Sequence, residues 1–289
     1  MNQWVNGKIA GFVAAYGDLF EAGGNRVLAL ILGVESLLQA LPWWVVVLAA
    51  AAIGYHATRH VAAPIGFALS LVLVGVLGLW ELAMQTLALT FVSVGVALVL
   101  GIPIGIGLAK SPAVRRAMLP VLDAMQTLPS FVYLVPALML FGLGKVPAVF
   151  ATVIYATPPL IRLTDLGIRM VADEFTEVAA DLGAERWQRL VDIELPLALP
   201  NVMAGINQTI MMALSMVVIA SMIGARGLGE QVLLGIQRLD VGQGLTAGIA
   251  IVALAVVFDR ITQAYGRADR RHRPLLRPLV RRLFDEGKT

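Results

Sequence analysis

Charged side chains gather in one internal segment, residues 173–196, which lies between two strongly apolar stretches and is called the polar loop below. Within the polar loop, Glu177 and Asp181 lie about one helical turn apart, and Val178 and Leu182 repeat this spacing on a neighbouring face. This pattern predicts a short amphipathic helix tethered at both ends to apolar segments. Such a loop can be held by a soluble partner, and the alternative is an ordinary solvated loop.

Gly183 is predicted to end this helix, because glycine adopts the left-handed conformation without a steric cost. A second short helix follows, with Trp187 and Leu190 on its apolar side. We expect Pro196 and Pro200 to break that helix and restart the chain, with Pro200 in the first turn of the next helix. The polar loop is therefore predicted to form a helix, a turn and a second helix.

The same segment resembles the EAA signature of bacterial ABC-importer permeases, which reads EAA, three residues, G, nine residues, I, one residue, LP. Residues 177–196 match every signature position except the second, where Val178 replaces Ala. In this family the loop is the coupling helix, which docks into a cleft on a separate ATPase subunit. The docking residues that the resemblance implies are Glu177, Val178, Ala179, Ala180, Asp181, Leu182, Gly183, Ile193, Leu195 and Pro196.

Composition places most of the chain in a membrane. Of the 289 residues, 58% are hydrophobic and 14% are charged, which is too apolar for an ordinary soluble domain. The fold class predicted is therefore an all-α integral membrane protein. The basic residues lie in short loops and in the C-terminal tail, where orientation in a lipid membrane explains them, so no nucleic-acid partner is expected.

The uncharged stretches predict about seven transmembrane helices. They lie at 42–57, 61–80, 82–109, 124–144, 146–161, 195–225 and 241–258. Residues 1–41 are predicted to be an N-terminal external or interfacial segment, loosely ordered up to residue 25, then helical with Glu35 off the apolar face. Residues 42–81 are assigned to two accessory transmembrane helices, 82–265 to the core domain that contains the polar loop, and 266–289 to a basic cytoplasmic tail.

The basic residues also predict the orientation, because Lys and Arg concentrate on the cytoplasmic side. If the polar loop is inside, the turns at Arg59 and at 110–116 and the C-terminal tail are inside too. That arrangement places 17 of the 22 basic residues inside and five outside. We therefore expect a multi-pass protein of the bacterial inner membrane, with its N-terminus outside and its C-terminus in the cytoplasm.

The stretches 123–144, 158–168 and 195–240 resemble the permease subunit of glycine betaine, proline betaine and choline uptake systems. The resemblance covers about residues 82–265 and implies the five-helix core of type I importer permeases. It further implies a homodimer of this chain, two ATP-binding cassette ATPase subunits and an external substrate-binding protein that selects the substrate. The implied function is translocation of a quaternary-amine compatible solute, driven by ATP hydrolysis on the partner, which would bind the ATP and Mg.

The sequence contains no constellation for catalysis. None of its lysines completes a phosphate loop, and no HExxH, GxSxG or cysteine motif occurs. The chain is therefore expected to be a transport subunit rather than an enzyme, with no catalytic residue, metal site or cofactor of its own. A self-sufficient channel or ion-coupled carrier is the alternative, but it would need midmembrane charges or an inverted repeat, and we find neither in the sequence.

Polar and flexible side chains after the polar loop are candidates for lining the translocation path. They are Asn207, Gln208, Met211, Met212, Ser215 and Met216. Unpaired amides are costly in hydrocarbon, so the two amide side chains must face another helix or a wet cavity. Hydrogen bonding between helices is the alternative role for the amides, and adaptable packing is the alternative for the methionines. Farther upstream, Gly101 and Gly105 are spaced for close contact between helices.

Overall fold

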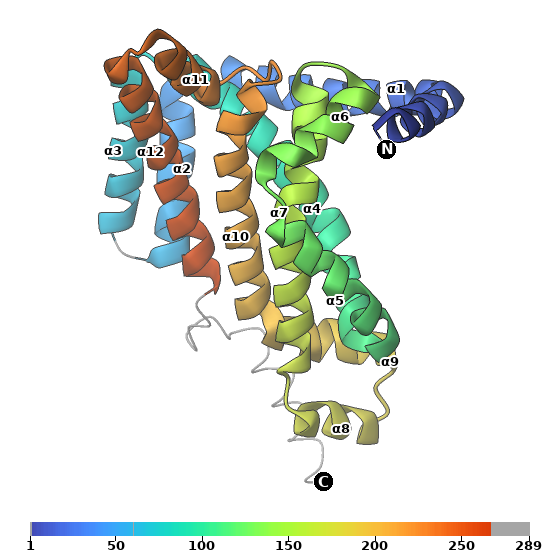
Figure 1. Ribbon diagram of the computed structural model, residues 1–289. Coiled ribbons are helices and arrows are strands. Elements are labelled where there is room, and N and C mark those ends of the chain that lie inside the picture. The colour runs from blue at the N-terminus through green and yellow to red at the C-terminus, as the bar shows by residue number, and fades with distance from the viewer. Residues whose placement is uncertain (1, 60, 267–289) are drawn as a thin grey trace.

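The computed structural model describes residues 2–59 and 61–266, which form helices joined by short turns (Figure 1). The helices are α1 (Asn2–Ala40), α2 (Trp43–Thr58), α3 (Ala62–Val76), α4 (Trp80–Lys110), α5 (Pro112–Thr127), α6 (Leu134–Phe141), α7 (Lys145–Arg169), α8 (Asp173–Asp181), α9 (Arg186–Arg189), α10 (Leu195–Ser221), α11 (Leu228–Arg238) and α12 (Val241–Gly266). A 3₁₀ turn (Ser130–Tyr133) precedes α6, and a π turn (Leu190–Glu194) precedes α10. The predicted all-α fold is confirmed.

Four helical stretches are long and apolar enough to cross a membrane alone: α4, α7, α12 and the continuous stretch Arg186–Ser221, which ends with α10. Two more spans are possible as bent pairs, one formed by the second half of α1 with α2 and one by α5 with Ser130–Phe141. Their bends are 100° and 109°. α3 is apolar but has only 15 residues. By length and composition, the described helices therefore support four to six spans, rather than the seven predicted.

Proline positions explain two of the differences from the predicted spans. The stretch 124–144 is broken, because Leu128 is extended and Pro129 supplies no backbone N–H, so α5 ends at Thr127. In contrast, α7 continues through Pro158 and Pro159 and runs on to Arg169, beyond the end of the predicted span 146–161. Pro129 therefore makes the stretch 124–144 part of a bent pair, whereas Pro158 and Pro159 leave α7 unbroken.

α1 is one continuous helix, so the prediction of loose order up to residue 25 is wrong for the described residues. Packing against later helices explains this order. The ring of Phe20 packs edge-on against Phe141 of α6 at a centroid distance of 5.9 Å, and Ile31 is fully buried. Glu35 is also buried, where its carboxylate pairs with Lys145 at the start of α7, instead of lying off the packed face as predicted. These tertiary contacts override weak local helix propensity.

α4 and α7 pack closely at the centre of the bundle. A Cβ added at Gly101 would lie 2.8 Å from Leu160 Cδ2, and one at Gly105 would lie 2.8 Å from the carbonyl oxygen of Ile161. The predicted close contact at these two glycines is therefore confirmed. The hairpin of α2 and α3 packs on α12 rather than standing apart, since Leu71 of α3 and Leu254 of α12 belong to one buried cluster.

Different helices lie at the two ends of the bundle (Figure 1). α1, α6 and α11 lie at one end, and α8, α9 and the first turns of α5 lie at the other. The turn after α2, which carries Arg59, is at the same end as α8. The basic turns that the orientation count placed on one side therefore lie at the same end of the bundle as the polar loop. Apart from Gly266, the predicted basic tail lies outside the described residues.

Candidate functional site

The polar loop forms a helix, a turn and a second helix, as predicted. α8 ends in a Schellman motif, in which the N–H of Ala184 donates to the carbonyl of Ala179 and the N–H of Gly183 donates to that of Ala180, both at 2.9 Å. Gly183 has a φ of +80°, which is the left-handed conformation. No heavy atom beyond its chain neighbours lies within 4 Å of where a Cβ would stand. The backbone of this turn, and not crowding, therefore favours glycine.

The second helix of the polar loop continues directly into the long helix α10. α9 begins with a capping box, in which the N-cap backbone N–H donates to Gln188 Oε1 at 2.8 Å. The chain then passes through the π turn, where the N–H of Leu195 donates to the carbonyl of Leu190. The predicted break at Pro196 and Pro200 is therefore wrong, because Pro196 lies in the first turn of α10, where its missing N–H is tolerated, and Pro200 lies inside that helix.

Large apolar side chains of the polar loop face away from the rest of the chain. Phe175, Val178 and Leu182 follow one face of α8, and Trp187 follows in α9. All four are exposed, Leu182 and Trp187 by 70% each. Ala179, between them in sequence, is buried. A row of exposed apolar side chains on an otherwise polar segment is typical of a surface that contacts a partner.

The ten predicted docking residues divide into an exposed group and an anchoring group. The exposed residues are Glu177, Val178, Ala180, Asp181, Leu182, Gly183 and Pro196. Ala179 is buried, and Ile193 and Leu195 are partly buried. Leu195 packs against the buried cluster of Ile168, Leu190 and Val202 at the base of the loop. The structure thus presents acidic and apolar side chains of α8 together and uses the end of the signature to hold the loop in place.

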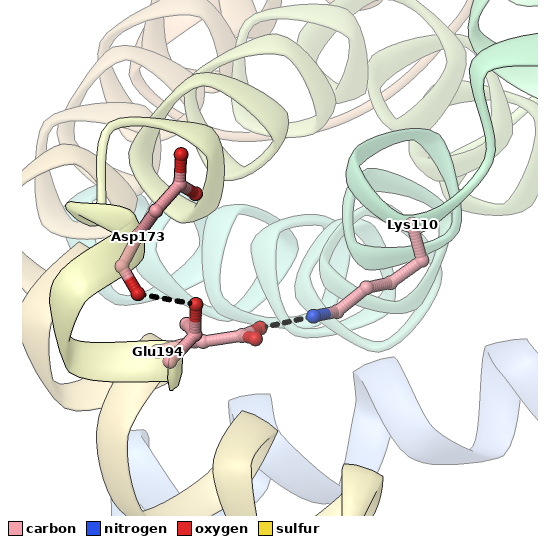
Figure 2. A network of polar contacts seen from close by, with 4 residues as sticks. Lys110, Asp173 and Glu194 are labelled. Carbon is pink, nitrogen blue, oxygen red and sulfur yellow. Dashed lines mark hydrogen bonds and ion pairs between the residues drawn. The ribbon is translucent and has the colours of Figure 1, made fainter. Parts of the chain in front are cut away.

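Two ion pairs join the turn between α4 and α5 to the C-terminal end of the polar loop and to the end of α7, which precedes the loop. Lys110 Nζ contacts Glu194 Oε2, and Figure 2 shows this pair beside Asp173 at the start of α8. Arg115 Nε donates to Asp165 Oδ2 at 3.0 Å. Sequence reasoning used both cations only to predict orientation and did not identify the carboxylates as functional. No local pattern joins Lys110 to a residue 84 positions away.

Among the path candidates, Asn207 makes hydrogen bonds between helices. Its Nδ2 donates to Asp259 Oδ1 at 2.9 Å, and its Oδ1 accepts from Thr262 Oγ1 at 2.6 Å. Gln263 Nε2 also donates to Asp259 Oδ1, at 2.7 Å. These bonds join α10 to α12 and satisfy both ends of the amide. The alternative role foreseen for this amide, joining helices, is the one that the structure supports within a single chain.

The remaining candidates lie on two sides of α10. Gln208, Met211 and Ser215 are exposed and recur at helical spacing, so they share one face. Met212 is partly buried, and Met216 is completely buried within the packed cluster at the centre of the bundle. Met216 is therefore a packing residue in this conformation and does not share the exposed face. Lining of a path stays a prediction for Gln208, Met211 and Ser215.

A cavity of about 500 Å³ opens beside this face, between α7, α10 and α12. Its lining combines the amides of Asn207, Gln208 and Gln263 with the hydroxyl of Thr262 and with apolar side chains. The full lining is Leu163, Pro200, Met203, Ala204, Asn207, Gln208, Thr262, Gln263 and Gly266. The cavity lies near the end of α10 that joins the polar loop, so a mixed polar and apolar surface continues from the loop into the bundle.

Comparison with known proteins places the chain among transport permeases. Residues 101–271 match the family described as "Binding-protein-dependent transport system inner membrane component". The glycine betaine/proline betaine transport system permease protein ProW of Escherichia coli is 45% identical over 270 residues, 93% of this chain and 76% of the relative. The glycine betaine/carnitine permease GbuB of Listeria monocytogenes is 53% identical over 197 residues, 68% of this chain and 70% of the relative. The glycine betaine permease OpuAB of Bacillus subtilis is 45% identical over 251 residues, 86% of this chain and 88% of the relative.

The fold is similar to that of a solved transporter. A crystal structure of the inward-facing MetNI methionine ABC transporter superposes with a TM-score of 0.57 over 63% of this chain and 93% of that chain, at 22% sequence identity. At this identity the likeness shows the fold alone, which is that of a type I importer permease. Because the family match covers more than half of the chain and the relatives align over most of it, the chain belongs to the family of binding-protein-dependent transport system inner membrane components, the permease subunits of ABC importers.

Proposed function

We propose that this chain is the translocating subunit of an importer for a quaternary-amine compatible solute, such as glycine betaine, proline betaine or choline. The relatives named for glycine betaine, with proline betaine or carnitine, are 45% to 53% identical to it. Two copies of the chain, two ATPase subunits and an external binding protein would form the complex. ATP and Mg bind the ATPase subunits, and this chain contributes no cofactor site.

One observation carries the proposal: α8 presents apolar side chains that are exposed among the described residues. Phe175, Val178 and Leu182 would each leave water on docking into a cleft, and burial of such side chains supplies about 1.5–3 kcal/mol each. Glu177 and Asp181 lie beside them and give the surface an acidic character that suits a basic cleft. The surface is therefore suited to a soluble protein partner of defined shape.

The exposed face of α10 supports a path next to this docking surface. Gln208 is exposed, and an amide facing lipid hydrocarbon would leave its hydrogen bonds unmade. We infer that Gln208, Met211 and Ser215 face the second copy or a water-filled path. α10 continues without a break from the polar loop, so a movement of the loop displaces this face directly.

The orientation of the chain in the membrane is inferred from the end of the bundle that carries the polar loop. The turn after α2, the start of α5 and the polar loop lie at one end of the bundle, and basic loops concentrate on the cytoplasmic side. We infer that this end contacts the ATPase and the inner leaflet lipid. α1, α6 and α11 would then face the external binding protein, with the N-terminus outside and the C-terminus in the cytoplasm.

Reconstitution tests this function. The chain is purified with its ATPase subunit, inserted into proteoliposomes, and supplied with the binding protein and labelled glycine betaine. Uptake should require ATP, the ATPase and the binding protein together, because the chain has no phosphate loop of its own. Uptake by the chain alone, without ATP, would show a self-sufficient channel or carrier and refute the proposal.

A further inference from the structure

Two buried carboxylates lie at the two ends of the segment that contains the polar loop. Asp165 lies near the end of α7, before the loop, and its side chain is 5% exposed; Glu194 lies at the end of the π turn, and its side chain is 8% exposed. Carboxylates that are removed from water in this way depend on a cationic partner. Each of the two has one, and both partners come from the same corner of the fold.

That corner is the turn between α4 and α5. Lys110 is the last residue of α4 and reaches Glu194, whereas Arg115 lies in the first turn of α5 and reaches Asp165. Only Ser111 separates the two helices, and it caps α5. One short corner of the fold therefore holds the chain both before the polar loop and near the C-terminal end of the loop.

The pair at Asp165 depends on Arg115 alone. Asp165 Oδ1 accepts no hydrogen bond from any described residue, and its other oxygen is the one that Arg115 binds. Removing the guanidinium would leave the buried carboxylate without a partner, which is strongly destabilising for that local arrangement. The carboxylate therefore fixes the position of the α5 start relative to the end of α7.

From this corner α5 leads into the broken span. A second pair, Arg162 with Asp123, ties the later part of α5 to α7. Beyond α5 the chain bends by 109°, and the hydroxyl of Tyr133 donates to the carbonyl of Met125 across the bend. α6 then packs on α7 and α1 at the opposite end of the bundle. The corner is thus the start of a continuous connection from the polar loop to the far side.

We propose that Lys110 and Arg115 are positioning residues that clamp the α4–α5 corner to Asp165, which precedes the polar loop, and to Glu194 near the C-terminal end of the loop. Displacement of the loop is then carried into the broken span α5–α6. This inference rests on the proposed docking of an ATPase at the polar loop. It assigns the coupling of ATP hydrolysis to transport partly to Glu194 and Asp165, which lie outside the exposed docking face. Loss of the clamp should therefore uncouple the two activities without releasing the ATPase.

Charge reversal and charge exchange test the clamp in the reconstituted complex. Lys110→Glu and Glu194→Lys should each lower uptake per ATP hydrolysed by about fivefold or more, the lower range of coupling effects, while the amount of bound ATPase stays unchanged. The double variant Lys110→Glu/Glu194→Lys should restore the ratio, because it rebuilds the pair with the charges exchanged. The matched control is Arg116→Glu, the same charge change on an exposed side chain whose hydrogen bond goes only to the Pro112 carbonyl. It should leave the ratio unchanged.

A second measurement reads the clamp without transport. The chain has no cysteine, so single cysteines at the exposed positions Ala113 and Asp192 can carry spin labels across the corner. In nanodiscs the distribution of distances between the two spin labels should be narrow in the otherwise unmodified chain. It should broaden in Glu194→Lys and become narrow again in the charge-exchanged variant. The inference would be overturned if the single charge reversals left the label distance distribution unchanged, or left the ratio of uptake to ATP hydrolysis unchanged. It would also be overturned if the charge-exchanged variant failed to restore the distance distribution or the ratio. If the unmodified chain transports in the absence of the ATPase subunit, the proposed function fails. The distances between the spin labels would still decide whether the clamp holds.

Discussion

Replacing Gly183 with valine should weaken ATPase docking and leave the membrane spans intact. Gly183 has a φ of +80°, and no neighbouring atom lies within 4 Å of an added Cβ, so the Cβ itself meets no clash. The cost is therefore backbone strain, about 1–2 kcal/mol for an L-residue in the left-handed conformation. The strain acts on a turn whose hydrogen bonds stay within residues 179–184.

That strain sets the expected size of the effect. A penalty of about 1–2 kcal/mol changes an equilibrium by a factor of about 5–30. If the strained turn relaxes away from the docking conformation, the apparent Kd for the ATPase rises by the same factor, because only the remaining population binds. Binding of the purified ATPase to the chain in nanodiscs measures this change, and membrane abundance and thermal unfolding report on the spans.

Gly78→Val is the matched control. Gly78 also has a positive φ, +70°, and also has open space around a Cβ, but it lies between α3 and α4 at the end opposite the polar loop. It should carry similar strain and leave ATPase binding unchanged. An unaltered Kd for Gly183→Val, or an equal loss in both variants, would refute the assignment of the turn to the docking surface.

Three further outcomes are expected. Leu182→Asp should weaken ATPase binding by about tenfold or more without changing thermal unfolding, because the Leu182 side chain is 70% exposed. Unaltered binding in the same nanodisc assay would contradict this prediction. Asn207→Ala should lower the free energy of unfolding in detergent by about 1–3 kcal/mol, because Asp259 and Thr262 each lose one of their hydrogen-bond partners. The exposed Gln208→Ala should change it by less than about 0.5 kcal/mol, and equal effects would argue against the hydrogen bonds. The homogeneous chain should release no phosphate from ATP, and hydrolysis that follows the chain through gel filtration would contradict the absence of a phosphate loop.

The features that sequence reasoning predicted correctly are local ones. The turn at Gly183 follows from a glycine placed after a helical repeat, and the amphipathic face of α8 follows from the spacing of Val178 and Leu182. Gly101 and Gly105 predict close helix contact for the same reason, since two small residues four apart share a face. Each of these signals lies within a few residues of the feature that it predicts.

The features that were missed depend on contacts between distant parts of the chain. Glu35 is buried because Lys145, 110 positions later, neutralises it, and no periodicity in α1 contains that information. Likewise, Pro129 and Pro196 are alike as local signals, yet one ends a helix and the other lies in a helical first turn. The hydrogen bonds available around each proline decide the outcome, and tertiary packing sets them.

The central claim, that an ATPase docks on the polar loop, can be tested by site-directed photo-crosslinking. Because the chain has no cysteine, one cysteine at the exposed Val178 of α8 can carry a photoreactive group, and one at the exposed Ile236 of α11 serves as the control on the opposite end. Illumination of the assembled complex in membranes should link the ATPase to position 178 and not to position 236. Linkage from position 236, or none from position 178 in a complex that hydrolyses ATP, would contradict the account.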